Sequence, residues 1–260
     1  QEQSQSPRAG PDQAGSLPAR RGLTRAVFGQ GPDDTAVAER LARVRARIRA
    51  AALRAGRDEG AVSLLAVSKR QAAGKIRAAH RAGQRAFGEN YLQEAVEKME
   101  ALGDLDLEWH FIGRIQSNKT RQIAEQFAWV HSLCDLRHAH RLSEQRPAGL
   151  PPLKACVQIN LDAEASKGGL DSDAVGAFLT ACVGLEKLDI VGLMTLPAPA
   201  EDEAAQRLPF RALRELRDRL ATPDRPLDVL SMGMSDDLEA AIAEGATLVR
   251  IGTAVFGPRA

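Results

Sequence analysis

Short apolar runs alternate with helix-like segments along most of the chain, and this alternation limits the folds open to it. Helix-like segments such as 72–82 and 92–102 separate runs of strand length at 62–69, 85–90, 107–113, 129–133, 153–161, 188–196, 227–233 and 248–256. Strands that alternate with helices pair in parallel, and eight such units favour a closed barrel over an open sheet. We therefore predict an α/β fold, a single (β/α)8 TIM-type barrel.

An N-terminal helix is expected to complete this barrel. Apolar residues recur at helical spacing at Val37, Leu41, Val44, Ile48 and Ala51, which predicts a helix over 34–55. The last predicted strand has almost no chain after it, so this helix is expected to cover that side of the barrel. Arginines occupy its other faces, and we interpret them as a solvent-facing surface and not as a nucleic-acid-binding one.

The first 33 residues differ in composition from the rest. They are rich in Gln, Ser, Pro, Gly and Arg and contain few large apolar side chains, which is typical of disordered segments. Three prolines, Pro7, Pro11 and Pro18, interrupt any amphipathic helix of the kind found in transit peptides. We predict a disordered tail over 1–33 and a barrel domain over 34–260.

Charge and cysteine usage narrow the possible partners. The 35 Lys and Arg residues nearly balance the 34 Asp and Glu residues, so no overall field draws the chain to nucleic acid or to an anionic membrane. The apolar runs are much shorter than the roughly 18 to 20 residues of a membrane-spanning helix. Cys134, Cys156 and Cys182 are widely spaced and form no CxxC pair. We expect a monomeric cytoplasmic protein without nucleic-acid or membrane partners.

Polar residues stand at nearly every predicted strand end, where the chemistry of a (β/α)8 barrel collects. These ends are Ser68–Lys69, Gly88–Asn90, His110–Gly113, Asn160, Met194–Thr195, Ser231–Gly233 and Arg250–Thr253. The first of them, in the run "LLAVSK", puts an amine directly after a strand that reads as buried on both faces. Lys69 is therefore a candidate nucleophile, with an exposed strand-end amine as the alternative.

The last two strand ends predict a phosphate site. Barrels often bind phosphate with the loops after strands seven and eight, where backbone N–H groups and a helix N-terminus meet the anion. Gly233 and Gly252 would let the backbone approach a ligand, and the hydroxyls of Ser235 and Thr253 could donate hydrogen bonds. The alternative is that Ser235 only caps the following helix.

A phosphate site and a lysine at one barrel mouth are consistent with a phosphorylated aldehyde held as a Schiff base. Partial burial and nearby cations favour the neutral, nucleophilic form of a lysine. Pyridoxal 5'-phosphate (PLP) fits this description, and Arg250, two residues before Gly252, could reach its pyridine nitrogen. A class I aldolase that uses Lys69 on a sugar phosphate is an alternative.

Six motifs carry a resemblance to a known family. In chain order they are "AVSK", "FGENYLQE", "WHFIGRIQSNK", "GLMTLPAP", "LSMGMSDDLEAAI" and "VRIGTAVFG", and over about residues 35–257 the chain resembles the pyridoxal phosphate homeostasis proteins. The resemblance implies a barrel like the N-terminal domain of alanine racemase. It also implies Lys69 as the Schiff-base lysine, Asn90 near the cofactor, Arg250 at the pyridine nitrogen, and phosphate ligands at Ser235, Gly252 and Thr253. Arg114 and the tail depart from the family pattern.

The resemblance implies a protein that carries and buffers PLP in vitamin B6 homeostasis and supplies it to PLP-dependent enzymes. It favours this role over an enzymatic one. Arginine only donates hydrogen bonds, so opposite Arg250 the ring nitrogen should stay unprotonated and the electron sink should be weak. The alternative is a PLP-dependent amino-acid racemase, which would need a second base. Tyr91 is the one tyrosine, and we expect no second domain.

The histidines are weaker candidates. His110, at a strand end, could act in acid–base chemistry or stack near the cofactor, but we interpret it as a packed structural residue. His131, His138 and His140 lack acidic or cysteine partners at metal-ligand spacing, so we predict no metal site.

Overall fold

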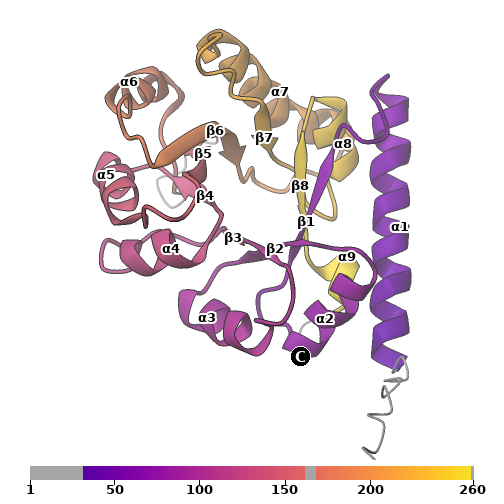
Figure 1. The fold of residues 1–260 in the computed structure, drawn as a ribbon. Coiled ribbons are helices and arrows are strands. Elements are labelled where there is room, and N and C mark those ends of the chain that lie inside the picture. Colours follow the sequence, from indigo (N-terminus) through magenta and orange to yellow (C-terminus); the bar gives the residue numbers. More distant parts are fainter. Residues whose placement is uncertain (1–31, 162–167, 259–260) are drawn as a thin grey trace, which may run out of the picture. The chain divides into compact units, whose positions relative to one another are not determined.

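The strands form a closed parallel barrel. The computed structural model describes residues 32–161 and 168–258. Neighbouring strands pair in sequence order and the last returns to the first (Figure 1). The strands are β1 (Ser63–Val67), β2 (Ala86–Glu89), β3 (Glu108–Phe111), β4 (Trp129–Leu133), β5 (Leu153–Ile159), β6 (Leu188–Thr195), β7 (Val229–Ser231) and β8 (Leu248–Ile251). The predicted (β/α)8 fold is confirmed.

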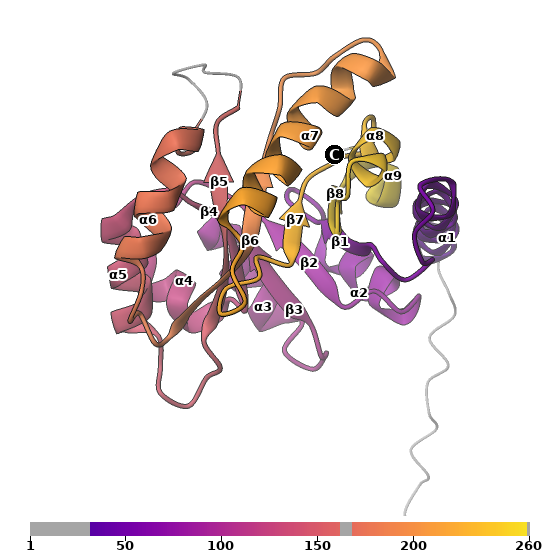
Figure 2. The same cartoon turned by 90° about the horizontal axis from the view of Figure 1, so that it is seen from above.

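Helices lie outside the ring of strands (Figure 2). They are α1 (Pro32–Arg54), α2 (Ala73–Arg81), α3 (Leu92–Ala101), α4 (Thr120–Gln126), α5 (Leu136–Gln145), α6 (Val175–Ala181), α7 (Glu203–Leu220), α8 (Leu238–Ala243) and α9 (Thr253–Phe256), with a 3-10 turn at Ser172–Ala174. None of the helices in the described part of the chain combines the length and the apolar character that crossing a membrane requires.

Helix α1 covers the barrel where the sequence pattern predicted it. It packs against α2, α8 and α9, with its apolar stripe of Val37, Leu41, Val44 and Ile48 buried (Figure 2). It begins at Pro32, whereas the predicted start was Asp34. Residues 1–31, which make up nearly all of the predicted tail, lie outside the described residues.

The last predicted strand is too long. The prediction placed a strand over 248–256, but β8 ends at Ile251 and residues Thr253–Phe256 form the short helix α9. The amides of Val255 and Phe256 donate to the carbonyl of Gly252 at 2.9 and 3.0 Å. Val255 and Phe256 are buried, so their apolar character reflects burial on a helical turn, which sequence alternation alone does not distinguish from a strand.

A buried ion pair holds the end of β1 against β2 and α3. The Glu89 carboxylate accepts hydrogen bonds from Ser68 Oγ at 2.6 Å and from Lys98 Nζ at 2.7 Å. Lys98 Nζ also donates to the carbonyl of Ser68 at 2.7 Å. The side chains of Glu89 and Lys98 are 0% and 8% exposed. Ser68, directly before Lys69, is therefore fixed by hydrogen bonds to β2 and α3.

This pair gives a stability prediction. We expect Lys98→Met to lower the free energy of unfolding by about 3 to 5 kcal/mol near pH 8, because it leaves a buried carboxylate without its cation. Burial already raises the pKa of Glu89 above its ordinary value, against the opposing effect of Lys98. An acid with a raised folded-state pKa costs stability above that pKa, and the cost disappears as the pH falls through it. The loss should therefore be smaller near pH 5, as measured by urea denaturation.

The control for this prediction is Arg77→Met, which breaks the ion pair between Arg77 and Asp104, whose side chain is 61% exposed. An exposed pair contributes little, so the control should unfold like the wild type at both pH values. Equal losses in Lys98→Met at both pH values would contradict the assigned role of Glu89.

Candidate functional site

A cavity of about 540 Å³ opens at the C-terminal ends of the strands. Its lining includes the six residues to which the family resemblance assigned a role at the cofactor, and it does not include Gly233: the six are Lys69, Asn90, Ser235, Arg250, Gly252 and Thr253. The remaining lining residues are Arg47, Val67, Ile112, Met194, Leu196, Met234, Asp236 and Ala254. Six residues that are scattered over the sequence thus meet in one place.

The end of β1 points Lys69 into this cavity. Side chains alternate along a strand, and both Val67 and Lys69 line the cavity while Ser68 between them is buried against Glu89. The chain then turns sharply: Gln71 N donates to Ser68 O at 3.0 Å, and Arg70 has a φ of 57°. An apolar strand can end in an amine because its last side chains face the cavity and not the core.

Arg250 lies deeper, on the inner face of β8. Its side chain is buried, and its two terminal nitrogens donate to Ser231 Oγ at 2.8 Å and to Thr195 O at 2.9 Å. Burial lowers the pKa of Arg250 to about 10, which still leaves the guanidinium charged at neutral pH. The cavity therefore has a fixed cation at its inner end.

Ser235, in the loop after β7, and Gly252 and Thr253, at the start of α9 after β8, form the other end of the cavity. Asp237, and not Ser235, occupies the N-cap position of α8, and its Oδ1 accepts from Met234 N at 2.6 Å. The interpretation of Ser235 as the helix cap is therefore wrong. Gly233 precedes this loop with a φ of +95°, and a Cβ there would lie 2.6 Å from Ala241 Cβ. Only glycine fits this turn.

The sequence analysis missed Arg47. It read the arginines of the first helix as a solvent-facing surface, but Arg47 lines the cavity beside Ser235. Arg47 Nη2 donates to Ser235 O at 3.1 Å and to Glu239 Oε2 at 2.9 Å. Helical spacing shows which face of α1 is apolar, but it carries no signal that the neighbouring face meets the loop before α8.

Asn90 supplies a buried acceptor. Its Oδ1 is buried and has no hydrogen-bond partner among the described residues. A buried acceptor without a donor is costly unless a water or a ligand satisfies it. The close approach of Gly113 places Asn90, since a Cβ at Gly113 would lie 2.0 Å from the backbone oxygen of Asn90. The lining thus combines an amine, an acceptor, two hydroxyls and a buried guanidinium, a set that fits a phosphorylated heteroaromatic aldehyde.

This close approach gives a second prediction. We expect Gly113→Ala to push the β2 end away and to lower the free energy of unfolding by about 1 to 3 kcal/mol, as overpacking typically does. The control is Gly103→Ala, because a Cβ there would lie 3.6 Å from Met99 O, in ordinary contact. Urea denaturation of both variants measures the difference. A Gly113→Ala protein as stable as the Gly103→Ala protein would show that the Asn90 backbone can move freely.

His110 does not belong to this cavity. Its ring stacks on Trp129, with ring centroids 5.0 Å apart and an interplanar angle of 8°, and it lines a different cavity at the N-terminal ends of the strands. Tyr91 is exposed and lies outside the lining. Arg114 lines a neighbouring cavity, and Asn90 lines both that cavity and the one that contains Lys69. Over 32–161 and 168–258, no group of three His, Cys, Asp or Glu side chains could hold a metal ion.

Comparison with known proteins shows the family of this chain. The family description "Alanine racemase, N-terminal domain" matches residues 40–260. A protein of Pseudomonas aeruginosa named pyridoxal phosphate homeostasis protein is 59% identical over 223 residues, which are 86% of this chain and 96% of that protein. The chain belongs to the pyridoxal phosphate homeostasis protein family. An Escherichia coli member of this family is 49% identical over 226 residues, 86% of this chain and 97% of its own length.

Solved structures support the same fold. PipY of Synechococcus elongatus, solved with PLP bound, is 38% identical and has a TM-score of 0.74, covering 85% of this chain and all of its own. Alanine racemase of Bartonella henselae, with covalently bound pyridoxal phosphate, has a TM-score of 0.65 at 18% identity. That likeness spans 87% of this chain and 60% of the racemase chain, and it shows the fold alone.

Proposed function

We propose that this protein binds PLP through Lys69 and buffers it for other proteins, as a member of a PLP homeostasis family. The observation that carries the proposal is the meeting of Lys69, Arg250 and the Ser235–Thr253 end in one cavity at the strand ends. The PLP-bound structure of the relative PipY supports the choice of ligand. An aldehyde, a pyridine nitrogen and a phosphate are the three groups that such a lining would recognise.

The lining residues divide by the group of PLP that each would contact. When bound, PLP supplies an aldehyde that condenses reversibly with a lysine amine and releases water. Lys69 would present that amine, while Ser235 and Thr253 would donate hydroxyl hydrogen bonds to the phosphate and Arg47 would add positive charge beside them. Arg250 would donate an N–H to the pyridine nitrogen. Asn90 would offer its buried Oδ1, which has no partner among the described residues, as an acceptor.

The proposed role is binding and release more than turnover. Arg250 donates only, so the pyridine nitrogen beside it stays unprotonated and withdraws electrons weakly. Two apolar side chains, Met234 and Leu196, line the cavity although they are 39% and 38% exposed. They can cover a planar ring and still leave a path to solvent. We propose that PLP leaves by this path for PLP-dependent enzymes.

We further propose that the protein works in the cytoplasm, as a monomer. The observation that supports the compartment is that Cys134, Cys156 and Cys182 are all free thiols, as expected in a reducing compartment. Burial raises the pKa of Cys156 to about 12, which keeps that thiol protonated and unreactive.

The first functional test concerns Lys69. The wild-type protein with PLP should show a visible absorption band that borohydride removes, and peptide mapping should then find the adduct on Lys69. Lys69→Ala should lack the band, because no other described lining residue carries a primary amine. Lys75→Ala is the control, since Lys75 Nζ is bonded to Gln71 and to the Phe256 carbonyl. An adduct on Lys75 or Lys119 would overturn the assignment.

The second test concerns the phosphate end. Ser235→Ala and Thr253→Val should each weaken PLP binding about ten- to a hundredfold, the effect of removing one hydrogen bond to a charged acceptor. Binding of pyridoxal, which lacks the phosphate, should be the same in both variants and the wild type. Titration of the visible band measures these dissociation constants. If both variants bind PLP like the wild type, the phosphate lies elsewhere.

A further inference from the structure

A chain of hydrogen bonds runs through the barrel interior from β3 to Arg250. Its links join Glu108 Oε1 to His110 Nε2 at 2.9 Å, His110 Nδ1 to His131 Nε2 at 2.9 Å, His131 Nδ1 to Ser231 Oγ at 2.8 Å, and Ser231 Oγ to Arg250 Nη1 at 2.8 Å. The four inner members are 0% to 4% exposed. A buried polar group without a hydrogen-bond partner costs free energy, so each hydrogen bond in this chain contributes to stability.

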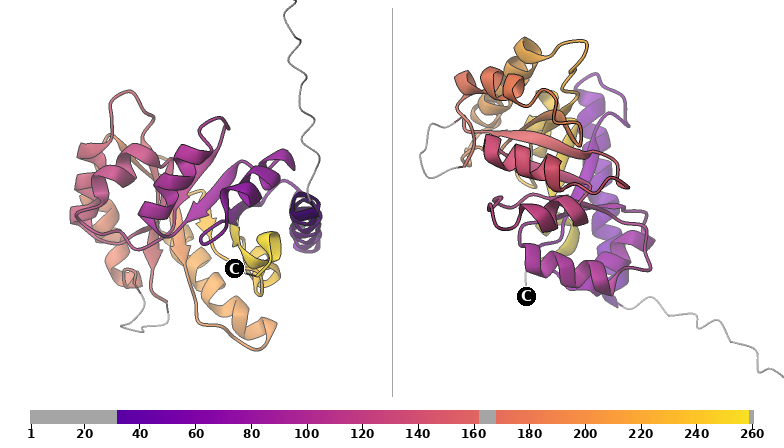
Figure 3. Two further views of the ribbon diagram at one scale, coloured as in Figure 1. Left: turned by 90° about the horizontal axis from the view of Figure 1, so that it is seen from below. Right: turned by 60° about the vertical axis from the view of Figure 1, so that its left-hand side comes forward.

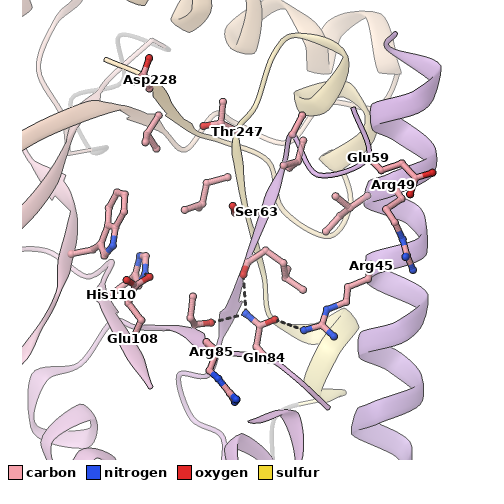
Figure 4. Close-up of a pocket in the computed structure, with 18 residues that line it drawn as sticks. Arg45, Arg49, Glu59, Ser63, Gln84, Arg85, Glu108, His110, Asp228 and Thr247 are labelled. Carbon is pink, nitrogen blue, oxygen red and sulfur yellow. Dashed lines mark hydrogen bonds and ion pairs between the residues drawn. The ribbon is translucent and has the colours of Figure 1, made fainter. Parts of the chain in front are cut away.

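The outer end of the chain opens into the cavity at the opposite mouth of the barrel. This cavity, of about 650 Å³, lies at the N-terminal ends of the strands, and Glu108 and His110 line one side of it (Figure 4). Gln84 and Arg45 lie on the other side, joined by a hydrogen bond of 3.2 Å (Figure 4). The Glu108 side chain is 47% exposed. The chain therefore begins at a solvated carboxylate and ends at a buried guanidinium.

Its two ends fix the position of every proton between them. An ionised carboxylate only accepts, so His110 Nε2 must donate to Glu108. A neutral His110 then accepts at Nδ1, which makes His131 Nε2 a donor. A neutral His131 in turn accepts at Nδ1, so Ser231 must donate its hydroxyl proton to it. Arg250 only donates, and Ser231 Oγ accepts from it.

The pKa shifts of His131 and His110 are consistent with neutral imidazole rings. Burial lowers the pKa of His131 well below its ordinary value, and the positive charge of Arg250 acts in the same direction. Burial also lowers the pKa of His110, with Glu108 opposing and Lys154 of β5 reinforcing the shift. The hydrogen bond from His110 lowers the pKa of Glu108, which keeps that carboxylate ionised.

This proton order has a consequence for Arg250. With its hydrogen turned toward His131, the Ser231 hydroxyl presents a lone pair to Arg250 Nη1. Thr195 O accepts from Nη2 at 2.9 Å. One acceptor on each terminal nitrogen holds the plane of the guanidinium. Without His131, the Ser231 hydroxyl could rotate and direct its hydrogen at Arg250.

We propose that His131 is a positioning residue that, with His110 and Ser231, orients Arg250 toward the pyridine nitrogen of bound PLP. The proposal rests on the proposed function, because it takes Arg250 to face that nitrogen. His131 itself does not line the cavity and acts through Ser231. The barrel interior thereby links its two mouths by a directed series of hydrogen bonds.

The first test needs no cofactor. Long-range 15N–1H correlation spectra of 15N-labelled protein without PLP, recorded near pH 7, report which ring nitrogens carry protons. His131 and His110 should both be neutral, with Nε2 protonated and Nδ1 bare. A doubly protonated His131, or one protonated at Nδ1, would overturn the chain whatever the protein binds.

The second test compares PLP with the analogue in which carbon replaces the ring nitrogen. The wild type should prefer PLP by about tenfold or more, the effect of one hydrogen bond from a charged donor. His131→Leu should bring this preference close to one while leaving the affinity for the analogue near that of the wild type. His131→Asn, which keeps an acceptor near the position of Nδ1, should restore most of the preference.

Two further variants make the outcome decisive. Ser231→Ala removes the acceptor of Arg250 directly, so it should also lose the preference and can replace His131→Leu if that protein does not fold. His140→Asn changes an exposed histidine on α5 and should behave like the wild type. Failure of the wild type to bind PLP overturns the proposed function. If the wild type binds PLP and the analogue equally well, the placement of Arg250 is wrong. If the wild type prefers PLP and both His131→Leu and Ser231→Ala keep that preference, only the proposed role of the hydrogen-bond chain is wrong.

Discussion

The pairing of β1 with β8 is the constraint on which the site depends. In this parallel pair Leu65 lies opposite Arg250 and Ala66 lies opposite Ile251. The turn that follows β8 therefore passes close to the end of β1, and a Cβ at Gly252 would lie 3.3 Å from Val67 O. Residues from the two ends of the barrel sequence become neighbours because the sheet closes. An open sheet would leave Lys69 and Thr253 at opposite edges.

The loop that carries Ser235 is held from outside the barrel. Glu244, directly after α8, is 1% exposed and accepts from three arginines of α7: Arg207 at 2.7 Å, Arg211 at 3.0 Å and Arg214 at 2.9 Å. Helices α7 and α8 lie side by side (Figure 3). At the other end of α8, Arg47 of α1 forms an ion pair with Glu239. The short helix behind the candidate phosphate end is thus fixed at both ends by ion pairs, which limits how far Ser235 can move.

Sequence reasoning predicted the eight strands in order, with the last one too long, and predicted that the candidate residues meet at one mouth, because both depend on local patterns. Strand order in a (β/α)8 barrel follows chain order, so polar residues at strand ends must meet at one mouth. The interior contacts carry no such signal. His131 and Ser231 are separated by 100 positions, and His131 was predicted to lack acidic or cysteine partners at metal-ligand spacing, which gave it no role. Arg47 was missed for the same reason, since its partners lie on α8.

Proteins of different function share the (β/α)8 barrel, so the function of this chain has to be argued from the side chains of its site. The alanine racemase of Bartonella henselae shares the barrel at 18% identity, a likeness that shows the fold alone. In this chain the described cavity lining offers Lys69 and Asp236 as its ordinary acid–base side chains, and Asp236 is exposed. Arg250 only donates, and hydrogen bonds to Ser231 Oγ and Thr195 O hold its guanidinium in place. The proposed binding of PLP by these groups would be equally strong before and after a proton moves, and uniform binding of this kind favours the proposed storage over catalysis.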